Sequence, residues 1–179
     1  MKNTNTNTNT NKINAMDIID KTINNEWPNW NDYSMKDYFT KVATLIPNQE
    51  KESIIVQKDY DKRYATTKGA CYAMVIDGKF VRQGKTDTTL KERIQSYNCG
   101  KQQYRNKGTC SVSNYKCLQS MLAINKPVEL YAYFVPPISF NAFGEDIVTN
   151  MSPAKYIEKI LNTKIEQEFN GKLPWCIQK

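Results

Sequence analysis

The stretch CYAMVIDGKFVRQGKTDTTLKERIQSY, residues Cys71–Tyr97, decides the fold class of this chain of 179 residues. Its first part is rich in β-forming residues and ends at Asp77-Gly78, a dipeptide typical of type I′ hairpin turns, and KFVRQG follows as the return strand. Beyond the strands, Thr89 and Glu92 have the spacing of a capping box at the start of a helix. The stretch therefore predicts a strand, a tight turn, a second strand and a helix.

The segments on either side of this unit complete the predicted fold. Apolar residues at helical spacing predict helices over 16–46, over 113–124 and over 154–169. Residues 128–135 are mostly β-formers and predict a third strand. From residue 53 onward the predicted order is β-β-α-α-β-α. This order indicates an α+β fold, with a small three-stranded antiparallel sheet flanked by helices and with added N-terminal helices.

The chain divides into three predicted parts. Residues 1–12 form an Asn-Thr repeat that is too polar to offset the entropy of ordering, so we expect a disordered low-complexity tail. We expect residues 13–52 to form a helical extension and residues 53–179 to form the main domain. No apolar run approaches the ~18 residues of a membrane span. The N-terminus also lacks the apolar region of a signal peptide, so we expect a cytoplasmic protein with no membrane partner.

Positive charge is concentrated in one segment of the chain. The formal net charge of the whole chain is +7. Residues 79–126 contain ten lysines and arginines against two acidic residues, which is a local balance of +8. This pattern favours a polyanionic partner such as nucleic acid, although a basic surface that serves only solubility has the same charge.

The histidine and cysteine content restricts the possible chemistry. The chain has no histidine, which excludes a Ser-His or Cys-His hydrolase and leaves a carboxylate, tyrosine, lysine or cysteine as a general base. Its five cysteines include no C-x-x-C pair, so the spacing argues against a zinc site and favours free thiols in a reducing compartment.

Four side chains of the opening stretch are candidates for one site. Tyr72 lies on the first predicted strand and Arg82 on the second, and Arg93 and Tyr97 are four residues apart on one face of the helix. If the helix packs beside the hairpin, these side chains converge on one concave patch. Neighbouring cations favour the phenolate form of a tyrosine, and we expect Arg82 and Lys85 to have this effect on Tyr72.

Such a patch contains groups that phosphodiester hydrolysis needs. The reaction requires a base for the attacking water, a cation for the charge that develops on the phosphoryl group, and usually a metal ion beside the leaving oxygen. A carboxylate is still needed to hold a metal ion. The predicted C-terminal helix offers three: Glu158, Glu166 and Glu168.

Taken in order, these segments resemble the GIY-YIG nucleases. ACY stands in place of GIY and retains Tyr72, and RQGKT stands in place of YIGKT, with Arg82 where the second tyrosine is usual. LKERIQSY resembles the arginine-bearing helix of the family, and YIEKIL resembles its glutamate helix and points to Glu158. PWCIQ resembles the closing P-W-N-x-Q, with Cys176 where asparagine is usual. The resemblance covers about residues 70–178.

The resemblance implies a function and a role for each site residue. It implies a type II restriction endonuclease that hydrolyses double-stranded DNA at a short palindromic site. Tyr72 is then the general base, Arg93 stabilises the phosphorane, and Tyr97 positions the phosphate. Glu158 holds a single Mg²⁺ ion, for which other divalent ions such as Mn²⁺ can substitute.

This interpretation also predicts partners and leaves alternatives open. A palindromic site implies a homodimer, and a restriction enzyme implies a cognate DNA methyltransferase that is encoded with it but is not a subunit. We expect the N-terminal helices and the basic loop over 98–111 to surround the DNA. The alternatives are a phage nuclease of relaxed specificity and a non-catalytic DNA-binding module. The residues expected to contact DNA phosphates are Lys101, Arg105, Lys107 and Lys116.

Overall fold

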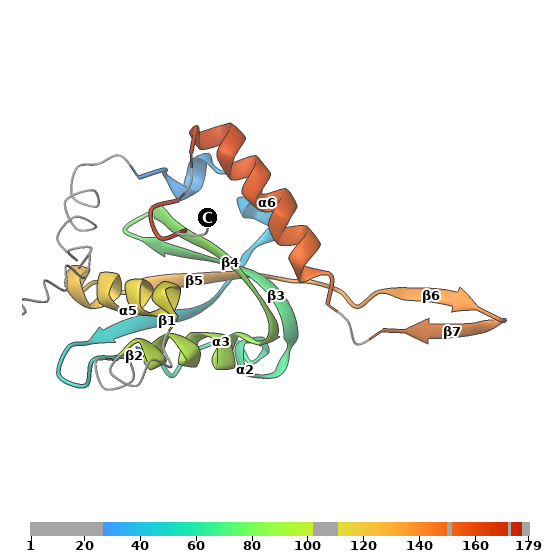
Figure 1. Cartoon of the computed structure of the whole chain (residues 1–179), viewed down its shortest axis with the longest axis horizontal. Helices are drawn as coiled ribbons and strands as arrows, with labels where there is room; N and C mark the ends of the chain where they lie inside the picture. Colours follow the sequence, from blue (N-terminus) through green and yellow to red (C-terminus); the bar gives the residue numbers. More distant parts are fainter. Residues whose placement is uncertain (1–26, 102–110, 150–151, 172, 177–179) are drawn as a thin grey trace, which may run out of the picture.

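A curved antiparallel sheet with helices on both faces forms the body of the molecule (Figure 1). The computed structural model describes residues 27–101, 111–149, 152–171 and 173–176. The expected disordered tail, and the part of the expected N-terminal helices that precedes residue 27, lie outside the described residues.

The sheet has five strands in the order β2-β1-β5-β3-β4, and all neighbouring strands are antiparallel. The prediction of a mixed α+β fold with an antiparallel sheet is confirmed, but the sheet is larger than the three strands expected. A separate two-stranded hairpin follows β5. The strands are β1 (Thr40–Asn48), β2 (Ser53–Val56), β3 (Lys68–Ile76), β4 (Lys79–Thr89), β5 (Val128–Phe134), β6 (Ser139–Ala142) and β7 (Glu145–Val148).

Four α-helices and three short 3₁₀ turns occur in the described part of the chain. The α-helices are α2 (Arg63–Thr66), α3 (Leu90–Tyr97), α5 (Val112–Ile124) and α6 (Ala154–Phe169). The 3₁₀ turns are η1 (Trp30–Asp32), η2 (Lys36–Tyr38) and η3 (Asn98–Gly100). The predicted capping box is present at α3, where the Thr89 hydroxyl accepts from the Glu92 backbone and the Glu92 carboxylate accepts from the Thr89 backbone.

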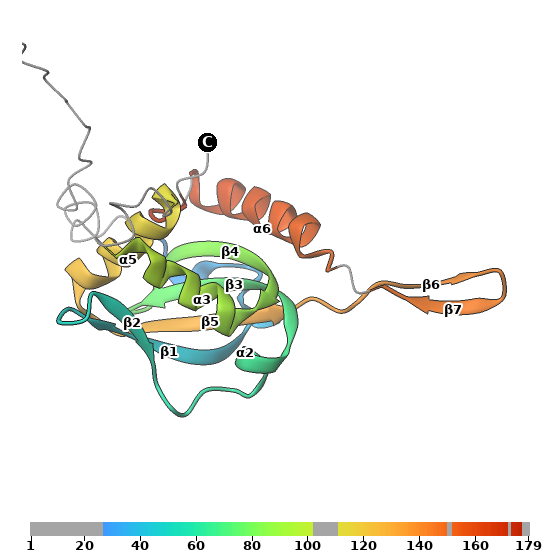
Figure 2. The same ribbon diagram turned by 60° about the horizontal axis from the view of Figure 1, so that its bottom comes forward.

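The two faces of β3 face two separate cores, because side chains alternate along a strand. Tyr72 and Met74 point into the core under α3 and α5, while Cys71, Ala73 and Val75 point into the core under α6. The second core also contains several aromatic side chains from the segment that includes the 3₁₀ turns η1 and η2. β3 is therefore buried on both sides (Figure 2).

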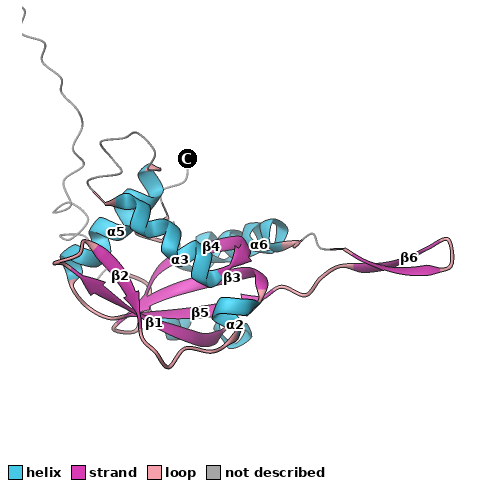
Figure 3. Cartoon of the chain, turned by 90° about the horizontal axis from the view of Figure 1, so that it is seen from below, coloured by secondary structure: helices cyan, strands magenta, loops and turns pink. Residues whose placement is uncertain are grey.

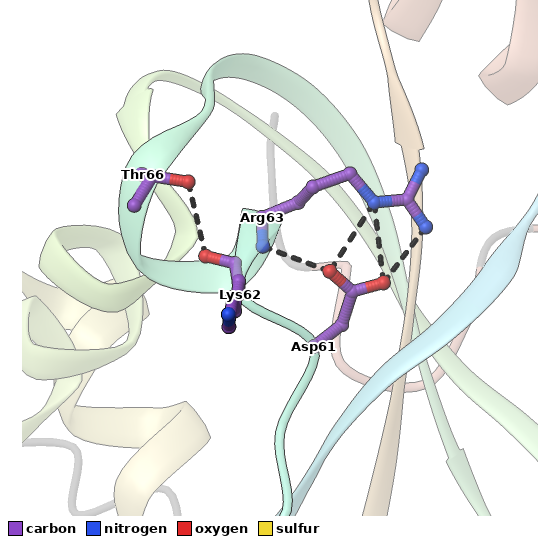
Figure 4. A network of polar contacts seen from close by, with 4 residues as sticks. All are labelled: Asp61, Lys62, Arg63 and Thr66. Atoms are coloured by element: carbon purple, nitrogen blue, oxygen red, sulfur yellow. Dashed lines mark hydrogen bonds and ion pairs between the residues drawn. The ribbon is translucent and has the colours of Figure 1, made fainter.

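A short polar network holds the turn before β3 (Figure 4). The Asp61 carboxylate accepts from the backbone N–H of Arg63 at 2.8 Å and from its guanidinium at 2.8–3.2 Å. The same guanidinium lies over the ring of Phe134, 5.0 Å from its centroid. These contacts attach α2 to the end of β5, although an exposed pair of this kind contributes little stability by itself.

The largest correction concerns the predicted helix over 16–46. Its last part is strand β1, which pairs with β5, so residues assigned to a helical extension supply a strand of the main sheet. The register of β1 against β5 shifts between Lys41 and Ala43. The bulge puts Val42 and Ala43 side by side among the buried residues. The bulge interrupts the alternation of buried and exposed side chains along β1, and this gives the apolar residues a helix-like spacing in the sequence.

Three further elements lie where none was expected, and one of them is the short helix α2. Strand β2 pairs with β1 at the outer edge of the sheet. Hairpin β6–β7 occupies part of the segment between the third predicted strand and the C-terminal helix, and it projects away from the body (Figure 3). No helix in the described residues is long and apolar enough to cross a membrane.

Candidate active site

A cavity of about 610 Å³ opens beside β4, one of the two edge strands of the sheet. Residues of α3, of α6 and of the C-terminal segment complete its wall. The residues that line the cavity include Arg82, Gln83, Gly84, Lys85, Asp87, Arg93, Glu158, Glu166 and Cys176. The sequence therefore brings the hairpin, the arginine helix and the glutamate helix to one place.

Two phenols and two guanidiniums form a connected unit on the α3 side of β4. The hydroxyl oxygens of Tyr72 and Tyr97 are 2.5 Å apart. Arg93 Nε donates to Tyr72 Oη at 3.1 Å, and Arg82 Nε donates to Tyr97 Oη at 3.0 Å. Both guanidiniums also lie over the Tyr97 ring. Arg82, which was expected beside Tyr72, thus contacts the other phenol.

The two phenols lie beneath the cavity surface. Tyr72 and Tyr97 are fully buried, and neither lines the cavity. Gly84 and Arg93 do line it, and both are against Tyr72: a Cβ atom added at Gly84 would lie 2.5 Å from Tyr72 Oη. Glycine is required at this position because any side chain would occupy the space of the phenol. Gly84 and Arg93 are thus cavity residues in direct contact with Tyr72 Oη.

The protonation of Tyr97 follows from its surroundings. Burial raises the pKa of the Tyr97 phenol well above its ordinary value, and the nearby Tyr72 adds to this rise. The guanidiniums of Arg82 and Arg93 offset only part of it. Tyr97 therefore stays protonated, and its hydroxyl can donate a hydrogen bond to Tyr72 Oη.

The C-terminal segment fixes Arg82. Arg82 Nη1 donates to the carbonyl oxygen of Trp175 at 2.5 Å, and Nη2 donates to Ser113 Oγ at 3.3 Å. The Trp175 backbone N–H donates to Val81 O at 3.0 Å, and Cys176 Sγ lies within 3.4 Å of both the backbone nitrogen and the backbone oxygen of Gln83. A thiol thus contacts the β4 edge at the position where the GIY-YIG pattern, which the sequence resembles, has asparagine.

Glu158 enters the cavity from α6, on the other side of β4. Burial raises the pKa of the Glu158 carboxyl above its ordinary value, and the nearby cations Lys85, Arg82 and Arg93 offset part of the rise. Lys85 forms an ion pair with Asp87. Of the other two candidate carboxylates, Glu166 also lines the cavity, whereas Glu168 accepts hydrogen bonds from Ser34.

Gln83 is a cavity residue that the sequence analysis missed. Its side chain is 3% exposed, and its Oε1 atom has no hydrogen-bond partner among the described residues. Gln83 and Lys85 are two residues apart on β4 and therefore lie on one face of the strand, but an amide at such a position has no periodic signature in the sequence. A buried amide oxygen without a partner costs free energy unless a ligand or water fills that role.

These groups fit one hydrated divalent cation. In the described part of the chain, no cluster of three or more histidine, cysteine or acidic residues could enclose a metal ion. Mg²⁺ commonly binds through one or two carboxylates and a substrate phosphate while it keeps several waters. Glu158 could supply such a carboxylate. Gln83 lines the same cavity and its Oε1 has no partner among the described residues, so it could accept from a metal-bound water once its buried amide turns toward the cavity.

The residues expected to contact DNA are not all at this cavity. Lys101 lines a second, shallower hollow together with Lys91, between α3 and η3. Lys116 is half-buried on α5 and lines neither hollow. Arg105 and Lys107 lie outside the described residues.

Comparison with known proteins identifies the fold first and then the family. No protein-family model matches the sequence, and no curated protein matches it. Among solved structures, a mutant of bacteriophage T4 EndoII is similar in fold, with a TM-score of 0.54 and 21% identity. That comparison covers 84% of this chain and 99% of the phage protein.

A second solved structure is similar in sequence as well as in fold. Restriction endonuclease HPY188I, in complex with product DNA, is 33% identical to this chain with a TM-score of 0.64. The comparison covers 92% of this chain and 91% of that chain. The chain therefore belongs to the family of restriction endonuclease HPY188I.

Proposed function

We propose that this protein is a DNA endonuclease of the GIY-YIG type and that the cavity beside β4 is its active site. One observation carries the proposal: in a chain of the HPY188I family, Arg93 and Glu158 line one cavity, and the buried Tyr72 contacts Arg93 directly beneath it. A base, a cation and a carboxylate close to one another are the groups that phosphodiester hydrolysis requires.

Tyr72 takes the part of the general base. In its phenolate form, Tyr72 Oη would accept a hydrogen bond from the Tyr97 hydroxyl, and before DNA binds it would also accept one from Arg93 Nε. It accepts a proton from the attacking water, whose oxygen forms the new bond to phosphorus as the bond to the 3′ oxygen breaks. The products are a 5′-phosphate and, after protonation, a 3′-hydroxyl. This step requires Tyr72 Oη to reach the cavity, so Arg93 must move aside when DNA binds.

Arg93 is suited to make that move. Its guanidinium already lines the cavity, and its contact with Tyr72 uses only Nε. A phosphate in the cavity can attract the guanidinium and accept from its remaining N–H groups, where it stabilises the phosphorane. Tyr97 contacts the Tyr72 hydroxyl from the buried side, and Arg82 holds Tyr97 in that position. Lys85 is available as a second cation once a phosphate competes with Asp87.

Glu158 and Gln83 would hold a Mg²⁺ ion, for which Mn²⁺ can substitute. When bound, the ion neutralises charge on the phosphate and on the leaving 3′ oxygen. The raised pKa of the Glu158 carboxyl makes the site sensitive to acid, because the protonated carboxyl binds metal poorly.

The family relation supports the narrower proposal of a type II restriction endonuclease acting at a palindromic site. One active site cleaves one DNA strand, so a homodimer with two-fold symmetry is suited to cleavage of both strands of a duplex. A cognate methyltransferase would then protect the host DNA. Phosphate contacts are proposed for Lys101 and Lys116, which lie outside the cavity, and for Arg105 and Lys107.

A second candidate function is a phage-type endonuclease of relaxed specificity. The fold shared with T4 EndoII favours it, but that likeness is of fold alone. A non-catalytic DNA-binding module is the third possibility. The buried network around Tyr72 and Tyr97 argues against it, because a module that only binds DNA has no use for paired phenols and guanidiniums beneath its surface.

Cleavage of plasmid and phage DNA with Mg²⁺ tests the proposal. We expect the wild-type protein to give discrete fragments and Glu158→Gln to give none. Glu166→Gln is the matched control, because Glu166 lies on the same helix and lines the same cavity. A smear or nicked circles would favour the relaxed enzyme. Salt-sensitive DNA binding without cleavage by any divalent ion would leave only the DNA-binding module.

A further inference from the structure

The β6–β7 hairpin is an arm without a packing partner. In the described chain its two strands pair only with each other, and they extend away from the five-stranded sheet (Figures 1 and 3). A bond from Thr149 N to Ile138 O at 2.9 Å closes its base, so we define the arm as residues 138–149. An isolated two-stranded hairpin is only marginally stable in water, which indicates that this arm packs against something else.

The arm has one apolar face. Phe140 pairs with Ile147 across the two strands, and cross-strand partners lie on the same face. Ile138 is two residues before Phe140 and shares that face. Phe140 is 49% exposed, Ile147 is 39% exposed and Ile138 is 46% exposed. The other face is mixed: Asn141 Nδ2 donates to Asp146 at 3.0 Å, and Val148, paired with Ser139, is 62% exposed.

The tip of the arm carries an aromatic ring at a strained position. Phe143 has φ 58° and is followed by Gly144 with φ 85°, so both residues are in the left-handed region. Type I′ turns prefer asparagine, aspartate or glycine at the first position, and a bulky residue is unfavourable there. Phe143 is nevertheless fully exposed. Strain of this kind at an exposed tip points to a role in contact.

The charge of the arm argues against DNA as its partner. Residues 138–149 contain Glu145 and Asp146 and no lysine or arginine, although the chain as a whole is basic. A polyanion would be repelled by these two carboxylates. A surface that is apolar and positively charged would match the arm on both counts.

The outer face of α6 is such a surface. Tyr156 and Ile160 are one helical turn apart and are 73% and 55% exposed. Lys155 and Lys159 are exposed beside them. Glu158, on the same helix, points to the cavity on the inner side. The arm extends away from the body of its own chain, so a second chain is needed to bring an arm onto this face (Figure 1).

We propose that the arm of one copy packs on the outer face of α6 of a second copy, and that the contact is reciprocal. Phe143, Phe140 and Ile147 would cover Tyr156 and Ile160, and Glu145 would meet Lys155 or Lys159. The contact is the same from both sides, as two-fold symmetry requires. Its use rests on the proposed nuclease function: each arm would brace the helix that carries the other copy's Glu158.

Sedimentation equilibrium of the full-length protein, without DNA or metal, tests the proposal. We expect a dimer whose dissociation constant rises at least ~10-fold in Phe143→Asn and in Ile160→Gln, equivalent to about 1.4 kcal/mol. Asparagine tolerates the left-handed conformation, so the turn itself is kept. Tyr38→Ser is the matched control, because Tyr38 is 64% exposed but lies on neither surface.

A charge exchange identifies the partner surface. Glu145→Lys and Lys159→Glu should each weaken the dimer, and the double variant should recover most of the affinity. Wild-type protein that stays monomeric at tens of micromolar would overturn the proposal, as would a dimer that none of these variants affects. Loss of DNA binding in Phe143→Asn with an unchanged dimer would assign the arm to DNA instead.

The outcome is independent of the nuclease assay. Glu158→Gln should dimerise like the wild type and fail to cut DNA. A chain that dimerises through these residues but never cuts would refute the proposed function and keep the interface. A monomer that nicks DNA with Mg²⁺ would refute the interface and keep the nuclease.

Discussion

Gln83 and Glu158 show how single residues of β4 and α6 set the chemistry of the cavity. One is a buried amide whose Oε1 lacks a partner among the described residues, and the other is a carboxyl whose pKa is raised by burial. Both conditions cost stability in the protein without a ligand, and both would be relieved by a bound cation. Groups that are unfavourable for folding often lie at functional sites.

Gln83→Leu separates the folding role of this residue from its binding role. Leucine removes the unpaired buried oxygen, so the free energy of unfolding should stay equal or rise by up to ~1 kcal/mol. Mn²⁺ affinity should fall ~10-fold, because the acceptor for a metal-bound water is lost. Urea unfolding without metal and Mn²⁺ titration by electron paramagnetic resonance measure the two effects. Unchanged Mn²⁺ affinity would remove Gln83 from the site.

The raised pKa of Glu158 predicts a pH dependence of stability with a definite sign. The folded protein holds the Glu158 proton more tightly than the unfolded chain, whose ordinary value is 4.5. The stability that this group contributes is complete below pH 4.5 and is lost as the pH rises through the raised folded value. Melting curves from pH 4 to 7 should therefore show a relative gain for Glu158→Gln toward pH 7 in the absence of metal. A constant difference between the two proteins across this range would contradict the prediction.

Tyr72, Arg93, Tyr97 and Glu158 could be singled out from sequence because each lies within a recognisable motif at a fixed spacing. The burial of these side chains could not be predicted from sequence. Alternation along a strand shows which face a side chain lies on, but not how deeply it is buried. That Arg82 contacts Tyr97 instead of Tyr72 depends on the packing of α3 over β4. Such packing has no signature in the local sequence.

At the scale of elements, local signals were sufficient where one pattern acted alone. The Asp77-Gly78 turn, the capping box of α3 and the helix over 154–169 were all predicted and are all present. β1 was predicted as a helix because its bulge mimics helical spacing. The β6–β7 hairpin was missed because its turn has phenylalanine where asparagine or aspartate would have marked it.

The capping box of α3 gives a prediction for a whole element. In Thr89→Ala the backbone N–H of Glu92 loses its acceptor, and we expect the free energy of unfolding to fall by ~1 kcal/mol. Thr163→Ala is the control, because Thr163 lies within α6 and its hydroxyl bonds only to the carbonyl of Lys159. Alanine should be neutral or favourable there. Equal losses in both variants by urea unfolding would show that the cap is not what holds α3.

At the scale of the whole molecule, the five-stranded sheet brings the site together. β4 is one of the two edge strands of this sheet. Helices α3 and α6 can therefore approach β4 from opposite faces and still leave the cavity open between them. The strands that the sequence analysis missed, β1 and β2, lie on the far side of β5 and do not touch the cavity. For this reason the candidate site could be predicted although the sheet was only partly predicted.

Tyr72→Phe tests whether Tyr72 performs the proposed proton transfer. Phenylalanine fills the same fully buried space and removes only the hydroxyl that meets Arg93 and Tyr97. The measurement is the single-turnover rate of strand cleavage with Mg²⁺, beside the dissociation constant of the same DNA. We predict that DNA binding is retained while cleavage slows by at least ~10²-fold. Cleavage at the wild-type rate by Tyr72→Phe would contradict the account.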